Sequence, residues 1–479
     1  MKRLIYLALA LPGMLGAQGM RVSGVTTVQL VELRRLVADS IAASSVAGAG
    51  EWRTTSDGVP ALCPTGAAFC QYERSGSRIN ATPLLQDLTF AGWGWQEGLS
   101  FHADVRARTQ LGSGGLVYPR ADDHFDLLDA YAELERTRWR GRLGRQWVSG
   151  SLGSYGFDGG DALWRRGEYS VEGWAGRALI AGLSEPYTSA QLAAVDNLPP
   201  QQDGYVFGGR ARFRPDALTA AAFTYQRVLL ADRSGLYSER AALDGSTRRL
   251  GMALDLGLTY DFATHDWNEA RLRASTAGLR AVGYSFEVRR TRPFFELWTI
   301  WGAFTPVGYN EARTTVDWTP PGSSFAYSVR GEYRKYSETN TGISLRTDGW
   351  RAGGDARWRG GAAWSAYGSY DVDIGSGAAS TDVRAGARWA GPSDVSLGAD
   401  AMVTQNIYEF RIGTGRIYGL MLDAAMPIRP DIRLVVDAGL YQHTLTNGAP
   451  GPDWTQRRAS VRLEWTAGRD PGAAVVKTP

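Results

Sequence analysis

The stretch Phe325-Ala-Tyr-Ser-Val-Arg-Gly-Glu-Tyr-Arg-Lys-Tyr336 decides the fold, because its apolar and polar residues alternate one by one. The alternation continues in residues 350–359 and, after a glycine turn at 360–361, in residues 364–374. Side chains of a strand point to opposite faces with a period of two. The three segments therefore predict three strands, each with one apolar, aromatic-ended face and one densely charged face. An exterior in lipid and a wet interior suit this division better than a soluble sandwich does.

Most of the remaining chain reads the same way. Alternation and turn residues predict further strands at 21–35, 88–95, 99–109, 126–136, 139–148, 162–166, 169–178, 205–214, 218–229, 249–260, 269–290, 314–318, 382–389, 395–404, 416–426, 432–443 and 458–465. Short Gly/Pro/Asp turns follow every second strand, and longer polar loops, including glycine-rich 150–160, follow the others. We predict an all-β fold, a transmembrane up-and-down antiparallel β-barrel of about 20 strands. The number is even in a range of about 18 to 22, the upper value applying if 269–304 splits into hairpins.

The two ends and one long loop complete the predicted organisation. Lys2-Arg3, the apolar run 4–15 and Ala17 are typical of a secretory signal peptide, here residues 1–17. We assign 18–468 to the barrel, with a long external loop at 39–82, and 469–479 to a C-terminal tail. An exported β-barrel belongs in the bacterial outer membrane of a Gram-negative cell.

The only two cysteines of the chain, Cys63 and Cys70, lie close together in the predicted external loop. In an exported protein this pair predicts a disulfide that closes a small loop. A metal site is the alternative, but it needs more ligands than the neighbouring sequence offers.

Arginine supplies nearly all the positive charge, since lysine occurs only at positions 2, 335 and 477. The formal net charge of +3 is too small to indicate nucleic-acid binding. Arginine pairs bidentately with carboxylates and keeps its charge in confined spaces, which suits a lumen lined by ion pairs.

Charged residues on the predicted inner face are the main candidates for contact with a solute. They are Arg106, Arg108, Arg142, Arg210, Arg212, Arg330, Glu332, Arg334, Arg351, Asp355, Arg357, Asp371, Arg384, Arg388, Asp437, Arg458 and Arg462. In lipid each arginine at mid-depth would cost about 2–4 kcal/mol, so a wet lumen is their natural place. They either select a polar or anionic solute or merely neutralise one another across neighbouring strands.

The aromatic segment 291–310 is the least regular part of the chain. It could fold into the barrel as a constriction, with Trp298, Trp301 and Phe304 presented to a sugar ring or an apolar solute. The alternative is one more lipid-facing strand rich in aromatic residues.

Catalysis finds little support in the sequence. The four histidines, His102, His124, His265 and His443, lie in no nucleophile motif and show no paired metal spacing. Glycine-rich runs are not followed by helices, so they do not predict phosphate-binding loops. We therefore expect neither an enzyme nor a cofactor or metal.

Three short motifs resemble the alginate-export and related substrate-specific porin families of the Gram-negative outer membrane. They are Asp129-Ala-Tyr-Ala-Glu133, Arg142-Leu-Gly-Arg-Gln146 and Phe157-Asp-Gly159, and the local likeness covers residues 124–180. The resemblance implies a monomeric barrel of about 18 strands with an arginine-lined conduit for anionic polysaccharide or small carboxylates. Arg142 and Arg145 have opposite parity, so one of them needs a bulge or a rim position to reach the lumen.

The leading hypothesis is an outer-membrane channel for passive diffusion of polar, anionic small solutes or saccharides through an Arg/Asp-lined lumen. The alternative is a non-conducting structural or surface-display barrel whose lumen is closed by ion pairs and by 291–310. Membrane lipid and a small solute are the expected partners, and the sequence does not distinguish a monomer from a trimer.

Overall fold

The computed structural model describes residues 19–56, 59–112, 124–179, 203–230, 238–279, 281–292, 308–337, 347–375, 379–409, 413–445 and 453–468. Nearly all of them are in β-strands, and short 3-10 turns occur at Ala43–Ser45 and Pro392–Asp394. Within these ranges no helix has the length and hydropathy that crossing a membrane requires. The predicted signal peptide 1–17 and the tail 469–479 lie outside the described residues.

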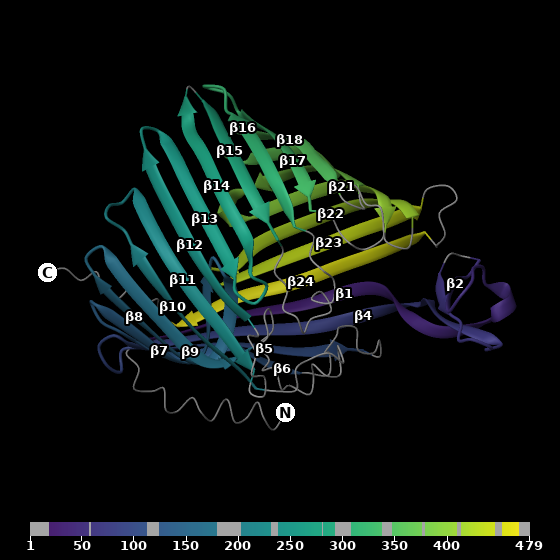
Figure 1. Cartoon of the computed structure of the whole chain (residues 1–479), viewed down its shortest axis with the longest axis horizontal. Helices are drawn as coiled ribbons and strands as arrows, with labels where there is room; N and C mark the ends of the chain where they lie inside the picture. The colour runs from purple at the N-terminus through teal and green to yellow at the C-terminus, as the bar shows by residue number, and fades with distance from the viewer. Residues whose placement is uncertain are drawn as a thin grey trace.

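The strands follow one another in antiparallel order around the molecule (Figure 1). The wall consists of β1 (Gly19–Ala42), β4 (Phe69–Trp93), β5 (Leu99–Leu111), β6 (Phe125–Glu135), β7 (Trp139–Gly150), β8 (Gly153–Arg166), β9 (Tyr169–Ala178), β10 (Gly204–Phe213), β11 (Thr219–Leu230), β12 (Ser238–Arg249), β13 (Met252–Asp261), β14 (Asp266–Leu279), β15 (Val282–Thr291), β16 (Tyr309–Trp318), β17 (Phe325–Tyr336), β18 (Asp348–Gly360), β19 (Trp364–Ile374), β20 (Ala379–Ala390), β21 (Ser396–Glu409), β22 (Gly413–Arg429), β23 (Ile432–Leu445) and β24 (Trp454–Gly468).

The first and last strands close the wall. β1 pairs with β4 on one side and with β24 on the other, where Val28 lies opposite Val461. Figure 1 shows the purple β1 beside the yellow β24. Closure leaves no unpaired edge along the barrel. The predicted all-β antiparallel barrel is confirmed, and its 22 strands fall within the expected even range.

One split region and one missed strand account for the difference between about 20 predicted strands and the 22 observed. The predicted ascending region 269–290 is in fact split into β14 and β15, with Ala281 at a positive φ of 73° in the turn. β12 has no counterpart in the sequence reading. Its outward positions include Glu239, Ala241 and Gly245 besides Leu243, so its apolar face is too weak to show the alternation of a strand.

Short turns gather at one end of the barrel and most of the longer connections at the other, as the up-and-down order requires. The glycine-rich segment 150–160, expected to be a loop, instead forms a hairpin with β7. β8 starts at Gly153, which pairs with Gly150. Leu250, expected inside a strand, lies with Gly251 in the β12–β13 turn, and both residues have positive φ. A two-residue hairpin turn of this kind needs positive φ at both positions.

The expected external loop 39–82 is mostly strand as well. Beyond Val31, where the pairing with β24 ends, β1 and β4 continue together as far as Ala42 opposite Phe69. This extension carries the hairpin β2 (Trp52–Thr54) and β3 (Pro60–Leu62), and it projects from the barrel at the right of Figure 1. A disulfide joins Cys63 to Cys70, and both half-cystines are buried in a small apolar cluster there.

The outer surface of the barrel is apolar. Exposed side chains there include Leu256 (38 %), Leu272, Phe286, Val329 and Leu440. Aromatic contacts ring the short-turn end, with ring centroids 4.9 Å apart for Tyr169–Phe213, 5.3 Å for Trp318–Tyr327 and 6.4 Å for Trp364–Trp389. An apolar band with aromatic residues at its margin is typical of a wall that faces lipid.

Candidate functional site: the charged inner wall

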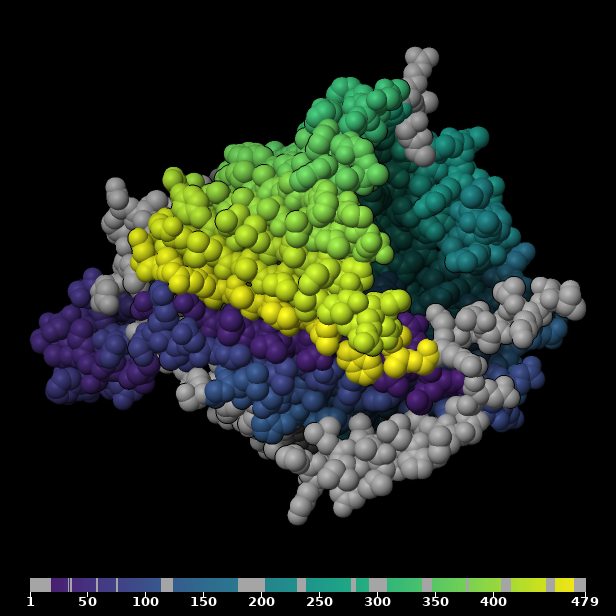
Figure 2. Space-filling model, turned by 180° about the vertical axis from the view of Figure 1, so that it is seen from behind, coloured from purple at the N-terminus to yellow at the C-terminus, as the bar shows by residue number. Residues whose placement is uncertain are grey.

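Contacts that skip strands identify the charged face as the interior. Arg334 on β17 donates to Asp373 on β19 at 2.9 Å, passing over β18. Arg240 on β12 reaches the carbonyl of Leu152 in the β7–β8 turn at 2.7 Å, passing over β9, β10 and β11. Side chains converge on the concave side of a curved sheet, so only the inner face permits such contacts. Figure 2 shows the hollow between the yellow-green and teal walls.

All predicted lumen residues have the parity of this inner face in the strand register. Neighbouring positions across the ladders include Arg330 opposite Gly353, Glu332 opposite Arg351 and Asp371 opposite Asp382. The inner-face set comprises Arg106, Arg108, Arg142, Arg210, Arg212, Arg330, Glu332, Arg334, Arg351, Asp355, Arg357, Asp371, Arg384, Arg388, Asp437, Arg458 and Arg462. Their parity could be read from the sequence, whereas their partners depend on the register between strands.

A ladder of ion pairs lines β16 to β19. Glu332, whose side chain is nearly buried, accepts from Arg313 at 2.7 Å and also contacts Arg334. Arg330 donates to Asp371 at 2.8 Å, across the glycine at position 353. A Cβ at Gly353 would lie 2.2 Å from the Asp371 carboxylate, so the missing side chain is what lets the arginine cross β18.

An inward glycine also lets an ion pair cross β21. Arg388 on β20 donates to Asp423 on β22 at 3.3 Å, and Gly398 lies between them on β21. A Cβ at Gly398 would lie 2.1 Å from the Asp423 carboxylate. The role of these inward glycines was not predicted from the sequence. Each one leaves room for an ion pair between the strands on either side of it, and the sequence does not show which strands those are.

The two arginines of opposite parity, Arg142 and Arg145, take different faces of β7. Arg142 faces inward and donates to Glu133 at 2.5 Å, while its guanidinium lies 5.0 Å from the Tyr131 ring centroid. Arg145 binds Asp158 through two hydrogen bonds of 2.7 and 2.8 Å and the Leu127 carbonyl at 3.0 Å. Arg145 therefore stabilises the wall between β6 and β8 rather than the lumen.

The tip of the β7–β8 hairpin folds into the interior. Arg210 on β10 donates to the Ser149 carbonyl at 2.6 Å, and the nearly buried Arg240 holds the Leu152 carbonyl. Arg240 also bonds the Tyr155 hydroxyl, and Leu152 and Tyr155 pack with Ala242 of β12. The tip is therefore fastened to strands on a different part of the wall.

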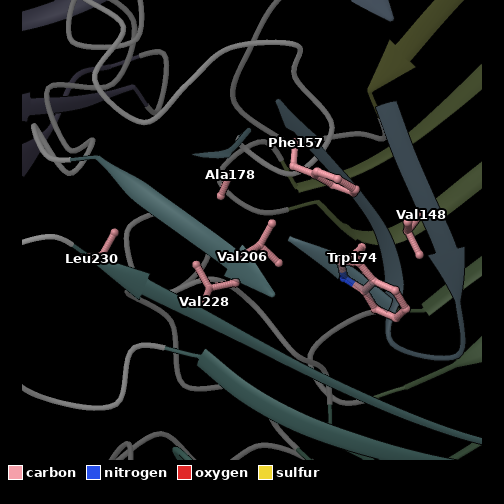
Figure 3. Packing of buried hydrophobic residues seen from close by; sticks show 7 residues of the cluster. All are labelled: Val148, Phe157, Trp174, Ala178, Val206, Val228 and Leu230. Carbon is pink, nitrogen blue, oxygen red and sulfur yellow. The ribbon is translucent and has the colours of Figure 1, made fainter. Parts of the chain in front are cut away.

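An apolar cluster lies on the inner wall near this tip. Figure 3 shows its members, contributed by β7, β8, β9, β10 and β11, namely Val148, Phe157, Trp174, Ala178, Val206, Val228 and Leu230. Arg210 lies 5.8 Å from the Trp174 ring centroid, where the apolar cluster meets the charged wall. The sequence did not reveal this cluster, since its members are scattered over more than 80 positions of the chain.

A recess of about 400 Å³ opens beside the tip. Its lining is rich in arginine, with Arg140, Arg142, Arg165, Arg210 and Arg212 around Asp161 and Glu172. Arg140 lies 3.0 Å from Glu172 and 3.5 Å from Asp161, so it is already paired. Among the described residues, the exposed Arg212 has no hydrogen bond or ion pair, and Arg384 on the opposite part of the wall is in the same state.

The predicted constriction residues Trp298, Trp301 and Phe304 lie outside the described residues. The inward tip of β7–β8 was not among the sequence-based candidates. Gly153, the first residue of β8, has a positive φ, which the sequence alone does not show.

Comparisons with known proteins yielded matches among solved structures alone, since no family model and no curated protein matches the chain. It is similar to OccAB1 of Acinetobacter baumannii, with 8 % identity and a TM-score of 0.41 over 95 % of this chain and 99 % of that chain. A BenF-like porin from Pseudomonas fluorescens Pf-5 matches with 9 % identity and a TM-score of 0.43, covering 93 % of this chain and 99 % of that chain. OccK9 (OpdG) of Pseudomonas aeruginosa matches with 10 % identity and a TM-score of 0.40, covering 94 % and 99 %. Similarity at this level does not establish an activity, and the strand pairing of the chain itself defines the barrel.

Proposed function

We propose that the protein is a Gram-negative outer-membrane channel that lets polar, preferentially anionic small solutes or saccharides diffuse passively through its charged lumen. The observation that carries the proposal is the closed wall, apolar outside and lined by arginines and carboxylates inside. In a bilayer every backbone polar group must be satisfied within the protein, and a closed barrel meets that requirement.

The distribution of charge between the two faces supports insertion in a membrane. Each arginine would cost about 2–4 kcal/mol at mid-depth in lipid. The inner wall instead pairs Arg313 with Glu332 and Arg334 with Asp373 at 2.7 and 2.9 Å. Such pairs tolerate water in a lumen and keep it polar, which favours solutes that are themselves polar.

A preference for anions rests on the arginines that the wall does not neutralise. Arg212 lies in the arginine-rich recess, and Arg384 is exposed on β20. Among the described residues neither forms an ion pair. A free guanidinium offers a planar set of donors that matches a carboxylate or phosphate.

Ion selectivity in planar bilayers tests the proposal. Purified folded protein in a KCl gradient should give a reversal potential of the sign that marks anion preference, and R212Q/R384Q should shift it toward zero. R429Q, a change at the β22–β23 turn, serves as the matched control for each single variant, R212Q and R384Q, because it also removes one positive charge. The decrease in single-channel current on adding each of several small sugars and organic acids then ranks these solutes by how strongly they bind in the lumen.

The outcomes separate this proposal from its rival. An absence of current from folded protein would favour the non-conducting structural barrel. Selectivity for anions that is unchanged in R212Q/R384Q would show that these arginines do not set the preference.

A further inference from the structure

His102, Asp104 and Asp129 converge at one point of the inner wall. His102 and Asp104 follow one another on the inner face of β5, and Asp129 lies directly opposite Asp104 on β6. The pairing of the two strands shifts register immediately after this position. One ligand atom from each residue lies within 4.8 Å of the other two.

Hydrogen bonding alone does not satisfy this arrangement. Both carboxylates approach the same atom, His102 Nε2, at 3.2 Å from Asp104 Oδ2 and 3.3 Å from Asp129 Oδ1. One N–H cannot point at both acceptors, and Asp129 Oδ1 is shielded from solvent without a hydrogen-bond partner. Asp104 Oδ1 is in the same state. Two like charges directly opposite each other also destabilise a ladder.

The distances fit a shared cation. Ligands that bind Zn²⁺ at about 2.0–2.1 Å in a tetrahedral site lie roughly 3.3 Å from each other. The two measured separations from Nε2 have this value, whereas a good N–H···O bond is shorter, about 2.9 Å. A divalent cation would also neutralise the two aspartates while the imidazole stays neutral.

The surroundings favour a cation site that is open on one side. The nearby cations are engaged elsewhere, Arg106 with Asp87 at 2.6 Å and Arg142 with Glu133 at 2.5 Å. The Tyr131 ring packs against the imidazole at a tilt of 37°, with ring centroids 5.3 Å apart, and limits its rotation. The side chains of the three candidate ligands are 20–29 % exposed, so an ion and its water can enter from the lumen.

We propose that His102, Asp104 and Asp129 form a site for a divalent transition-metal cation of the Zn²⁺ class. The three side chains supply one nitrogen and two oxygens, and water occupies the remaining position. A mixed nitrogen and oxygen set with an open position suits zinc and its neighbours better than Ca²⁺ or Mg²⁺, which prefer oxygen ligands alone.

Metal titration of tag-free, metal-stripped, folded barrel in detergent tests the site. Calorimetry with Zn²⁺ should show one strong site per chain. Co²⁺ in its place should give the visible absorption of a four-coordinate ion. H102Q and D129N should each weaken Zn²⁺ binding by about tenfold or more. H124Q removes another imidazole, one that lies next to the Arg108 carbonyl, and should leave the affinity unchanged.

Two results would overturn the proposal: no saturable Zn²⁺ binding, or binding that H102Q, D104N and D129N all leave intact. The first would indicate that a proton shared by the carboxylates and the imidazole holds the cluster together. Heat-dependent migration in gels verifies that each variant is folded. Bilayer conductance, measured on the same samples, reports separately on the proposed channel.

Discussion

Among single residues, inward glycines determine which ion pairs the wall can form. Arg330 and Asp371 lie on β17 and β19, and only the absence of a side chain at Gly353 of β18 allows them to meet. Gly331 of β17 points to the outer face, and a Cβ there would make only an ordinary van der Waals contact, 3.9 Å from a Thr314 methyl group. A methyl group added at Gly353 would therefore clash with the Asp371 carboxylate, whereas one added at Gly331 would not clash.

We expect G353A to destabilise the barrel by about 1–3 kcal/mol, because the new Cβ displaces the Asp371 carboxylate and leaves Arg330 only its longer contact with Asp355, at 3.7 Å. G331A should be neutral or stabilising by up to about 1 kcal/mol, since it lowers the entropy of the unfolded chain. Urea unfolding in lipid vesicles, followed by tryptophan fluorescence, measures both. Equal effects of the two substitutions would contradict the role given to Gly353.

Among the elements, the β7–β8 hairpin departs most from a plain barrel wall. Its tip is held by two arginines from β10 and β12, and the Arg240 side chain is almost fully buried against it. A hairpin that crosses part of the interior narrows the path for a solute. Its position therefore bears on conductance as well as on stability.

R240M should release the tip, because the Leu152 carbonyl and the Tyr155 hydroxyl lose their donor while a side chain of similar length remains. We expect a larger and noisier single-channel conductance and a loss of about 1–3 kcal/mol in unfolding free energy. R273M is the control, since Arg273 faces the lumen from β14 without a hydrogen bond or ion pair among the described residues. Unchanged conductance in R240M would mean that the tip does not obstruct the path.

For the whole molecule, closure assigns one face of every strand to the exterior and the other to the lumen. Leu256 of β13 lies outside and is 38 % exposed. Ser246 of β12 has the inner parity, opposite Asp255. The same new charge should therefore be costly at Leu256 and tolerated at Ser246.

L256R should cost about 2–4 kcal/mol of folding free energy in a bilayer, the value for arginine at mid-depth in lipid. S246R should be nearly neutral, because the lumen is wet and Asp255 offers a partner there. The free energy of folding into lipid vesicles, determined for both variants in bilayers of the same thickness, measures the difference. Similar costs would argue against a lipid-facing exterior.

The sequence by itself determined the class of fold, the parity of the candidate lumen residues and the even number of strands. Alternation with a period of two is a local property, so it can be recognised without knowing which strands pair with each other. β12 was missed because its outward face, with Glu239, Ala241 and Gly245, lacks the apolar half of the pattern.

Only the tertiary structure decided which charges meet. Arg330 meets Asp371 across Gly353, Arg240 holds the β7–β8 tip, and Asp129 of β6 approaches His102 of β5 beside a register shift. These contacts depend on the register between strands and on the curvature of a closed wall, which brings side chains of non-adjacent strands together. Neither quantity is encoded in the spacing of residues along one strand.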